Sequence, residues 1–455
     1  MSAKLVLLGL NHKVAPVEIR ERLAVSPGRL SEVLPALRET GGAAELVVLS
    51  TCNRFEVYAV LGDAQRSDGS DLVAGTAGTG QRVNVPAGAG TAESALLYAL
   101  AALRGIALAD FASYLYVRRA AEAAGHLCRV ACGLDSLLVG EYQILGQVKT
   151  AFQAAQEASS TGPVLSALFR QAIHAGKRAR TETEIGVGAR SLGQVAVSLA
   201  RQNLGDLSQR TALMVGAGKM SELTGRALAE AGLHCLLVSN RTFDRAVALA
   251  ESLGGQAVHF DGLAASLQRA DLVIAATGAP HIVLHEADMA AAMAGRPDRS
   301  MVVIDLSVPR NVDPAVRSLH GLRLYDMDDL VTVVAEHHPV AAPAIAAAEG
   351  IAAQEASAFM GWWRQRQAAP VIQALRAQAG SVRQAELARA LRRLGPLTAE
   401  QENALQAFSQ ALVNKLLHTP TCRLKSPDNG HGQEDYLAVV SDLFSLGESK
   451  ATPRG

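Results

Sequence analysis

ELVVLSTCNRFEVYAV, residues 45–60, predicts a buried strand, a tight polar turn and a second strand. The run ELVVL is rich in Val and Leu, which is typical of a core strand, and the alternation in FEVYAV indicates a partner strand with one wetter face. The turn places the thiol of Cys52 beside the guanidinium of Arg54. Because a nearby positive charge lowers the pKa of a thiol, Cys52 is a candidate nucleophile. The alternative is a small buried hydrophobic residue at a strand end.

Composition indicates a multidomain globular protein. A length of 455 residues predicts about three domains, and 49% hydrophobic with 19% charged residues suits a soluble chain. Lys and Arg total 43, as do Asp and Glu, which argues against a general nucleic-acid binder and leaves only a local basic patch for such contacts. Five scattered cysteines predict free thiols in a reducing compartment. With neither a signal peptide nor an apolar span expected, we predict a cytoplasmic protein that does not associate with a membrane.

Two further segments accompany the thiol turn: GLNHKVAPVEIRERLA at residues 9–24 and HLCRVACGLDSLLVGEYQILGQVK at residues 126–149. Together with STCNR they closely resemble glutamyl-tRNA reductase, the first committed enzyme of the tRNA-dependent route to tetrapyrroles. The resemblance covers nearly the whole chain and implies an α/β multidomain fold. It places an α+β catalytic and glutamyl-tRNA-binding domain at 1–185, a Rossmann-like NADPH-binding domain at 186–330, and a long connecting helix with an all-helical dimerisation domain at 331–455.

The resemblance also implies the chemistry and its residues. Cys52 attacks the ester of glutamyl-tRNA(Glu), releases tRNA, and holds a glutamyl thioester that NADPH reduces to glutamate-1-semialdehyde. His126 is a second catalytic candidate, which either transfers a proton or positions the ester. Arg54 matches the partner of the substrate carboxylate, and Glu141 is the candidate for its ammonium group. The substrate-binding residues implied in this way are Thr51, Asn53, Arg54, Ser136, Glu141, Tyr142, Gln143 and Gln147.

A dinucleotide-binding pattern begins at residue 211 with TALMVGAGKMSELTGRALAEAG, which predicts a strand, a glycine turn and a helix. Ser221 stands where the third glycine of the fingerprint falls. The next strand ends near Arg241 in place of the Asp or Glu that holds the ribose of NAD, which favours NADPH because an Arg accommodates the 2′-phosphate. The predicted cofactor-binding residues are Gly216, Ala217, Gly218, Lys219, Met220, Ser221, Asn240, Arg241 and Thr242.

Two polar clusters in the first half have alternative interpretations. Cys128 and Cys132, spaced i, i+4 on a helix expected to begin near His126, suggest either zinc ligands or core cysteines. The helix predicted at 164–181 carries a basic face, which is either ordinarily solvated or, in the family, a contact for tRNA phosphates. Its basic residues are Arg170, His174, Lys177, Arg178 and Arg180.

After residue 330 the sequence predicts only helices, at 343–367, 371–394 and 398–418. Their heptads are not strict, so we expect packing between subunits of a homodimer. The stretch 62–90, rich in Gly, Ala, Ser and Thr, predicts a mobile surface insertion. The family also suggests glutamate-1-semialdehyde aminomutase as a further partner.

Two other functions are compatible with parts of the sequence. GAG, SNRT and DLVIAATG at residues 216–278 also resemble the nucleotide domain of shikimate dehydrogenases, which predicts oxidation of a free alcohol with no need for a thiol. A tRNA-binding regulator would instead use the nucleotide domain as a sensor. It would bind tRNA after Cys52 is alkylated and would consume no NADPH.

Overall fold

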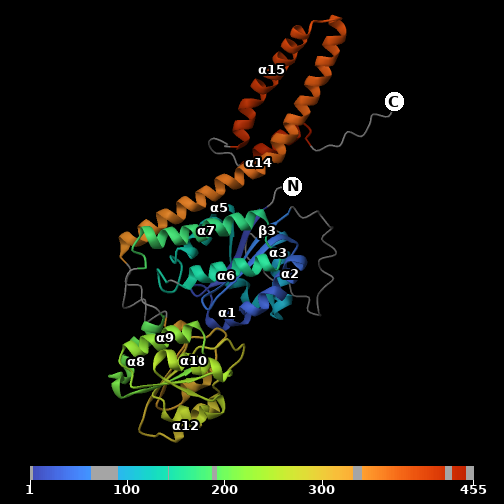
Figure 1. Cartoon of the computed structure of the whole chain (residues 1–455). Coiled ribbons are helices and arrows are strands. Elements are labelled where there is room, and N and C mark those ends of the chain that lie inside the picture. The colour runs from blue at the N-terminus through green and yellow to red at the C-terminus, as the bar shows by residue number, and fades with distance from the viewer. Residues whose placement is uncertain are drawn as a thin grey trace. The chain divides into compact units, whose positions relative to one another are not determined.

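The computed structural model describes residues 4–62, 91–141, 143–186, 192–330, 341–425 and 433–446. The described residues form two compact units, one from residue 4 to residue 356 and one from residue 357 to residue 446. The first unit holds two separate sheets and the second is helical (Figure 1). The insertion predicted at 62–90 lies, apart from Gly62, outside the described residues.

The N-terminal sheet has the strand order β2-β3-β1-β4, and all of its neighbouring strands are antiparallel. Its strands are β1 (Lys4–Asn11), β2 (Ala43–Ser50), β3 (Arg54–Leu61) and β4 (Tyr116–Arg119). All eight residues of β3 are buried, so the predicted wetter face is wrong. The polar side chains of this strand lie inside because they satisfy one another: the Tyr58 hydroxyl donates to the Glu56 carboxylate at 2.7 Å.

Helices cover this sheet: α1 (Val17–Leu23), α2 (Leu30–Thr40), α3 (Thr91–Arg104), α4 (Leu108–Phe111), α5 (Ala120–Ala131), α6 (Gln143–Glu157) and α7 (Pro163–Glu182). The start of α7 shows how sheet and helix are joined. Pro163 occupies the first turn, where its missing N–H costs nothing. The buried Glu45 carboxylate of β2 accepts hydrogen bonds from the N–H groups of Val164 and Leu165, at 3.0 and 2.6 Å. A negative charge at a helix N-terminus is stabilising, which fixes α7 to the strand that leads into the thiol turn.

The second sheet is entirely parallel, in the order β10-β9-β8-β5-β6-β7. Its strands are β5 (Thr211–Val215), β6 (Cys235–Ser239), β7 (Gln256–Val258), β8 (Leu272–Ala275), β9 (Met301–Asp305) and β10 (Leu322–Tyr325). The accompanying helices are α8 (Leu192–Leu204), α9 (Lys219–Glu230), α10 (Phe243–Leu253), α11 (Leu263–Arg269) and α12 (Glu286–Ala294). Strand order reverses between β5 and β8, which is where such sheets bind ligands. The predicted Rossmann-like fold is therefore confirmed.

The C-terminal helices are longer than the sequence suggested. α14 (Ala342–Leu394) runs unbroken through Pro370, so the predicted interruption between two helices is wrong. Ala368 and Ile372 pack with Leu424 of α15 (Ala399–Lys425) on both sides of this proline, and that burial offsets the lost hydrogen bond. A last helix, α16, spans Gln433–Leu443.

Over the described ranges, no single helix combines the length and the apolar character needed to cross a bilayer. Only the pair Ala92–Arg104 and Leu108–Tyr114, bent by 103°, meets both criteria jointly.

Candidate active site

The thiol turn between β2 and β3 is closed by Thr51. Its N–H donates to the Arg54 carbonyl at 2.9 Å, and its hydroxyl oxygen accepts from the N–H groups of Asn53 and Arg54, both at 3.2 Å. The N–H of His12 donates to the Asn53 carbonyl at 2.9 Å and ties the turn to the end of β1. Cys52 is thereby held at the tip of a turn whose backbone is fixed on both sides.

Cys52 is half-buried, and its environment keeps the thiol protonated. Burial and the nearby Glu141 carboxylate raise the pKa of Cys52 to about 12, while the charges of Arg20 and Arg54 act in the opposite direction. Arg54 therefore lowers the pKa of Cys52, as predicted, but burial and Glu141 raise it by more. Cys52 becomes a nucleophilic thiolate only if its pKa is lowered.

Arg54 is engaged by acidic groups in this structure. Its Nη1 donates to Glu56 Oε1 at 2.8 Å and to Asp135 Oδ2 at 3.2 Å, and its Nη2 donates to the Asp135 carbonyl. The side chain is only 1% exposed. Burial opposes its charge, but Glu56 and other neighbours leave the pKa of Arg54 above its usual value. Its buried Nε has no partner among the residues described, so one donor stays available.

His126 reaches this network through Glu56. Its Nε2 lies 2.7 Å from Glu56 Oε1, which also accepts from the Tyr116 hydroxyl at 2.6 Å. Although burial opposes it, Arg54 and His126 hold the pKa of the Glu56 carboxyl well below its usual range. His126 lies in the middle of α5, not near its start as predicted, because AAEAAG ahead of it begins the helix at Ala120.

The segment 133–147 brings four predicted substrate residues to the same domain. Ser136 is buried and Glu141 half-buried, and burial raises the pKa of the Glu141 carboxyl to about 7. Gln143 and Gln147, one turn apart on α6, are half-buried. Gly140 fixes the path before Glu141, because its φ is +83° and a Cβ there would lie 1.8 Å from the Ile185 carbonyl oxygen. Tyr142 lies outside the described residues.

Four buried polar atoms near the turn have no hydrogen-bond partner within the described ranges: Asn53 Oδ1, Ser136 Oγ, Arg54 Nε and His12 Nδ1. Buried polar groups are ordinarily paired, so an unpaired set is a mark of a ligand site. An amide oxygen, a hydroxyl and a guanidinium N–H suit a ligand with both an ammonium and a carboxylate group.

Several residues of this network were not singled out from the sequence. Asp135 binds Arg54 and also accepts from Lys13 Nζ at 2.5 Å, and Tyr116 binds Glu56. Glu56 carries a local signal, since residues i and i+2 of a strand share a face and Arg54 precedes it. Asp135 and Tyr116 carry none, because they lie 81 and 60 residues from their partners Arg54 and Glu56.

The predicted cofactor turn follows β5. Gly216 has φ +114°, and a Cβ there would lie 2.3 Å from the Ala276 carbonyl oxygen, whereas a Cβ on Gly218 would meet no atom within 4 Å. The second position thus leaves room for a ligand at the N-terminus of α9. Ser221 fills the third position and donates to the Ala276 carbonyl at 3.2 Å. This arrangement fits the pyrophosphate of a nicotinamide dinucleotide.

The remaining predicted cofactor residues surround this turn. Ala217 and Met220 pack against the hydrophobic cluster on one face of the sheet, and Lys219 pairs with Glu222 at 2.9 Å. Beyond β6, the Asn240 side chain donates to the Thr242 carbonyl at 2.9 Å. Arg241 is exposed beside them, and within the described ranges no carboxylate pairs with it.

The structure shows what surrounds the cysteine pair near the end of α5 and the basic face of α7. Cys128 and Cys132 are buried, burial raises the pKa of both thiols, and among the described residues no group of His, Cys, Asp and Glu could hold a metal ion. On α7, Arg178 pairs with Glu182 and Glu355, both at 2.7 Å, and His174 contacts the same Glu355 at 3.1 Å. Part of the basic face is therefore used within the protein.

Three family models match the chain in succession. They are the glutamyl-tRNAGlu reductase N-terminal domain at residues 8–183, shikimate / quinate 5-dehydrogenase at 198–333, and the glutamyl-tRNAGlu reductase dimerisation domain at 347–446. They confirm the predicted three-domain architecture and an oxidoreductase with a nicotinamide-type nucleotide domain.

Relatives match along the whole chain. Glutamyl-tRNA reductase of Moorella thermoacetica is 42% identical over 442 residues, covering 97% of this chain and 95% of the relative. That of Chloroflexus aurantiacus is 40% identical over 457 residues, covering 97% and 99%. The solved glutamyl-tRNA reductase from Methanopyrus kandleri is 31% identical and covers 97% of this chain and 99% of its own, with a TM-score of 0.47. By its sequence along nearly its full length, this chain belongs to the glutamyl-tRNA reductase family.

Proposed function

We propose that this protein reduces glutamyl-tRNA(Glu) to glutamate-1-semialdehyde with NADPH and releases tRNA, the first step of tetrapyrrole synthesis. The observation that carries the proposal is the thiol turn at Cys52, lined by unpaired buried polar atoms, in the same compact unit as a dinucleotide-binding glycine turn. The names of the relatives give the substrate class.

Cys52 performs the acyl transfer. Its sulfur attacks the ester carbonyl, a C–S bond forms, the ester C–O bond breaks, and the tRNA hydroxyl leaves with the proton that the thiol gave up. A thioester carbonyl accepts hydride more readily than the ester it replaces. When bound, NADPH supplies that hydride, which makes the aldehyde. Cys52 is then released and takes up a proton.

Substrate binding supplies the change in charge that this attack needs. We assign the substrate ammonium to Glu141, whose carboxylate is one of the groups that raise the pKa of Cys52. A bound ammonium group neutralises that effect, so the thiol becomes more acidic only when substrate is present. We assign the substrate carboxylate to Arg54, through its unpaired Nε.

The other site residues support this geometry. Asn53 and Ser136 offer unpaired polar atoms to the substrate, and Thr51 keeps the turn closed. Gln143 and Gln147, with Tyr142, complete the predicted binding segment. His126 fixes Glu56 and through it Arg54, so we favour its positioning role over direct proton transfer.

NADPH binding is assigned to the turn from Gly216 to Ser221 and to the loop from Asn240 to Thr242. The N-terminus of α9 would hold the pyrophosphate, and the exposed Arg241 would hold the 2′-phosphate. Lys219 is held by Glu222 and adds positive charge beside the same turn.

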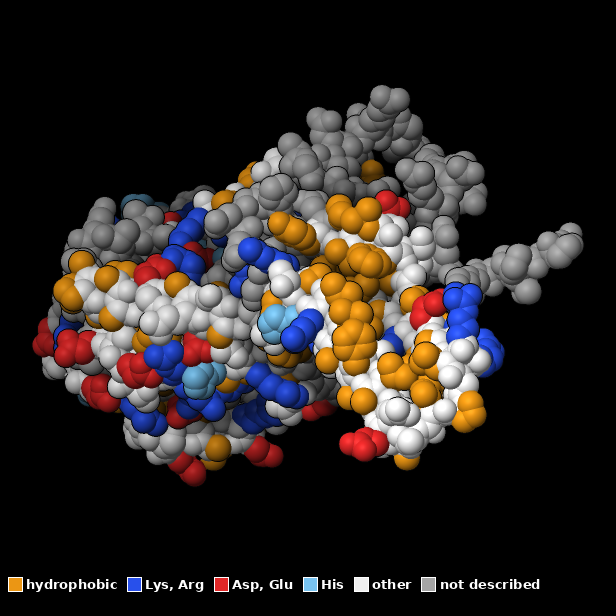
Figure 2. Space-filling model, turned by 90° about the horizontal axis from the view of Figure 1, so that it is seen from above, with side chains coloured by type: hydrophobic (Ala, Val, Ile, Leu, Met, Phe, Trp, Pro, Cys, Tyr) orange, Lys and Arg blue, Asp and Glu red, His pale blue; other side chains and the backbone are white. Residues whose placement is uncertain are grey.

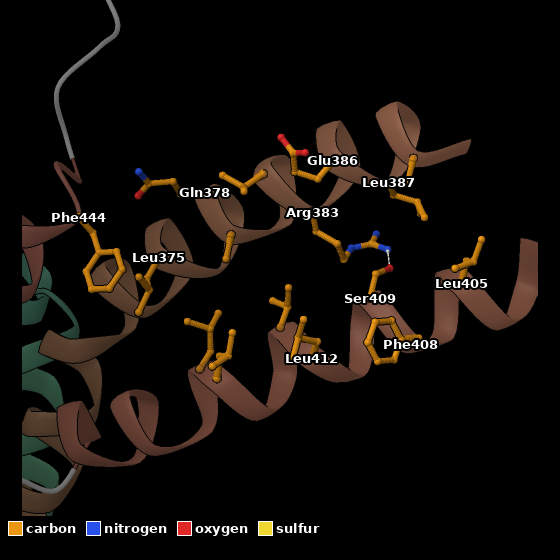
Figure 3. Close-up of a pocket in the computed structure, with 16 residues that line it drawn as sticks. Leu375, Gln378, Arg383, Glu386, Leu387, Leu405, Phe408, Ser409, Leu412 and Phe444 are labelled. Carbon is orange, nitrogen blue, oxygen red and sulfur yellow. Dashed lines mark hydrogen bonds between the residues drawn. The ribbon is translucent and has the colours of Figure 1, made fainter. Parts of the chain in front are cut away.

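A homodimer accounts for the apolar face of the helical unit. Exposed hydrophobic side chains of α14 and α15 line a groove of about 530 Å³, with Phe408 66% and Leu416 66% exposed (Figure 3). Hydrophobic side chains also form a band in the view from above (Figure 2). The matching dimerisation-domain model makes a second copy of this chain the occupant. We place the dimer in the cytoplasm, where its five free thiols are stable and the aminomutase is a further expected partner.

The direct test is transfer of labelled glutamate from tRNA to protein in the absence of NADPH. We expect label on the Cys52 peptide, released by hydroxylamine, and none in Cys52→Ser. A matched control is Cys235→Ser, a half-buried cysteine on β6. Label that persists in Cys52→Ser would refute the thioester route.

A further inference from the structure

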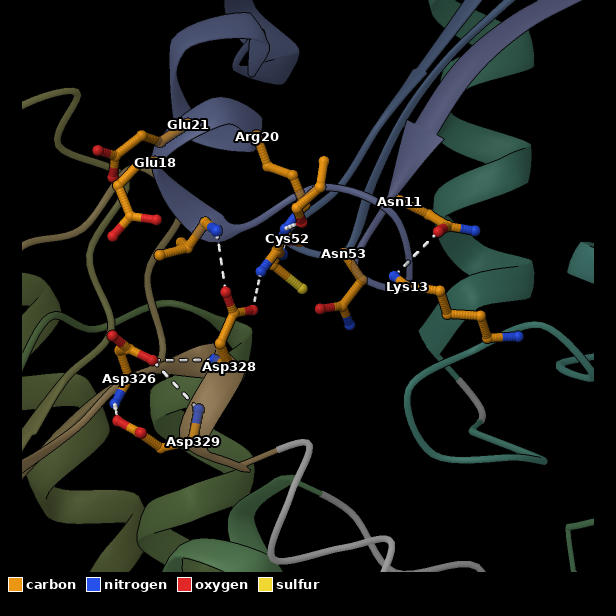
Figure 4. A network of polar contacts seen from close by, with 12 residues as sticks. Asn11, Lys13, Glu18, Arg20, Glu21, Cys52, Asn53, Asp326, Asp328 and Asp329 are labelled. Atoms are coloured by element: carbon orange, nitrogen blue, oxygen red, sulfur yellow. Dashed lines mark hydrogen bonds and ion pairs between the residues drawn. The ribbon is translucent and has the colours of Figure 1, made fainter. Parts of the chain in front are cut away.

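One short helix, α1, joins the thiol turn to the parallel-sheet half of the first unit. The N–H of Val17 donates to Asp328 Oδ2 at 2.9 Å, and Arg20 Nη2 pairs with Asp328 Oδ1. Arg20 Nη1 donates to the carbonyl of Cys52 itself. Figure 4 shows this chain of contacts from Asp328 through Arg20 to the thiol turn.

All three nitrogen atoms of the Arg20 guanidinium donate hydrogen bonds at this junction. The side chain is 2% exposed, and its Nε donates to the Ala15 carbonyl at 3.2 Å. Its planar guanidinium therefore binds the loop before α1, the backbone of the nucleophile and Asp328 at once. A rigid fork of donors holds three partners at fixed mutual positions in a way that a flexible ammonium does not.

A second link lies on the same helix. Arg310 Nη2 pairs with Glu21 at 2.8 Å, and its Nη1 pairs with Glu18 at 2.7 Å. Arg310 lies in the loop after β9 and Asp328 in the helical turn at residues 327–330 after β10, so both partners lie beyond the carboxyl ends of parallel strands. That edge of the sheet faces the bound dinucleotide in folds of this class. Cys52 also packs against the hydrophobic cluster on one face of the same sheet.

We propose that Asp328, acting through Arg20, is a positioning residue that holds the thiol turn against the cofactor-facing edge of the parallel sheet, and so governs hydride transfer separately from acyl transfer. The inference rests on the proposed function. Acyl transfer needs only the N-terminal domain, whose substrate groups do not involve Asp328. Reduction needs the thiol turn and the cofactor-binding edge of the parallel sheet at fixed relative positions. A misplacement of about 1 Å lowers the rate on the order of a hundredfold.

The test compares the two half-reactions in Asp328→Asn, which keeps the size of the side chain and removes its charge. Glutamyl transfer to Cys52 without NADPH should stay within about twofold of wild type. With NADPH, the ratio of aldehyde to hydrolysed glutamate should fall by about tenfold to a hundredfold. Asp110→Asn is the matched control, because Asp110 pairs with the exposed Arg22, which lies on α1 as Arg20 does. This substitution should leave both half-reactions unchanged.

Arg310→Gln removes the ion pairs with Glu18 and Glu21 but leaves the contacts of the thiol turn intact. It should also lower the ratio of aldehyde to hydrolysed glutamate. An Asp328→Asn ratio equal to wild type, or an equal loss in both half-reactions, would overturn the inference. Thermal melting shows whether each variant is folded. If Asp328→Asn is misfolded, the ratio of aldehyde to hydrolysed glutamate in Arg310→Gln decides whether the inference holds. A wild-type protein that takes no label on Cys52 would instead refute the proposed function.

Discussion

The thiol of Cys52 should be unreactive in the free protein, which alkylation can measure. Burial and Glu141 raise its pKa from 9.0 to about 12. Since each pH unit below the pKa lowers the thiolate fraction tenfold, about a thousandfold less thiolate is present at pH 8 than for a thiol at the ordinary value. We expect the alkylation rate of Cys52, followed by peptide mass, to rise about tenfold per pH unit from pH 7 to 10 without a plateau.

Glu141→Gln removes the carboxylate charge, so the pKa of Cys52 should fall and the alkylation profile should move to lower pH. The exposed Cys422 in the same digest controls for loss of reagent. Gln keeps the size of the Glu141 side chain, so steric shielding of Cys52 stays the same and a change in rate at a given pH reports the change in the pKa of Cys52. A plateau below pH 8.5 in the wild-type protein, or a Glu141→Gln profile that does not move, would refute the proposed electrostatic control.

Three further outcomes follow from the geometry. Gly216→Val should abolish NADPH oxidation but spare label transfer to Cys52, because a Cβ there would lie 2.3 Å from the Ala276 carbonyl oxygen; loss of labelling as well would count against separate sites. Arg241→Ser should raise KM for NADPH about tenfold to a hundredfold and leave KM for NADH unchanged, since a charge-assisted hydrogen bond contributes about 1.5–3 kcal/mol. Phe408→Asp should convert the dimer to a monomer in sedimentation, and an intact dimer would remove the groove from the interface.

The parts predicted well from sequence are those whose signal is local. The thiol turn needs only two apolar strands and a polar link, and the cofactor turn needs only a strand, glycines and a helix. Both patterns lie within about 20 residues, so neighbouring positions determine them. The repeated strand-helix units likewise indicate parallel strands.

The parts that were missed depend on distant residues. Asp135 reaches Arg54 from 81 positions away, and Asp328 reaches Arg20 from 308. The burial of Glu56 was hidden for the same reason, because a polar strand residue reads as exposed until its partners are known. The unbroken course of α14 through Pro370 likewise depends on tertiary packing, which offsets a strong local signal to stop.

The central claim is that one thiol and one nicotinamide site act on a charged tRNA. NADPH oxidation by the purified protein, measured with glutamyl-tRNA beside free glutamate and beside Cys52→Ser, tests it most directly. The account predicts oxidation only with glutamyl-tRNA and only when Cys52 is present. Oxidation with free glutamate, or equal oxidation by Cys52→Ser, would contradict it.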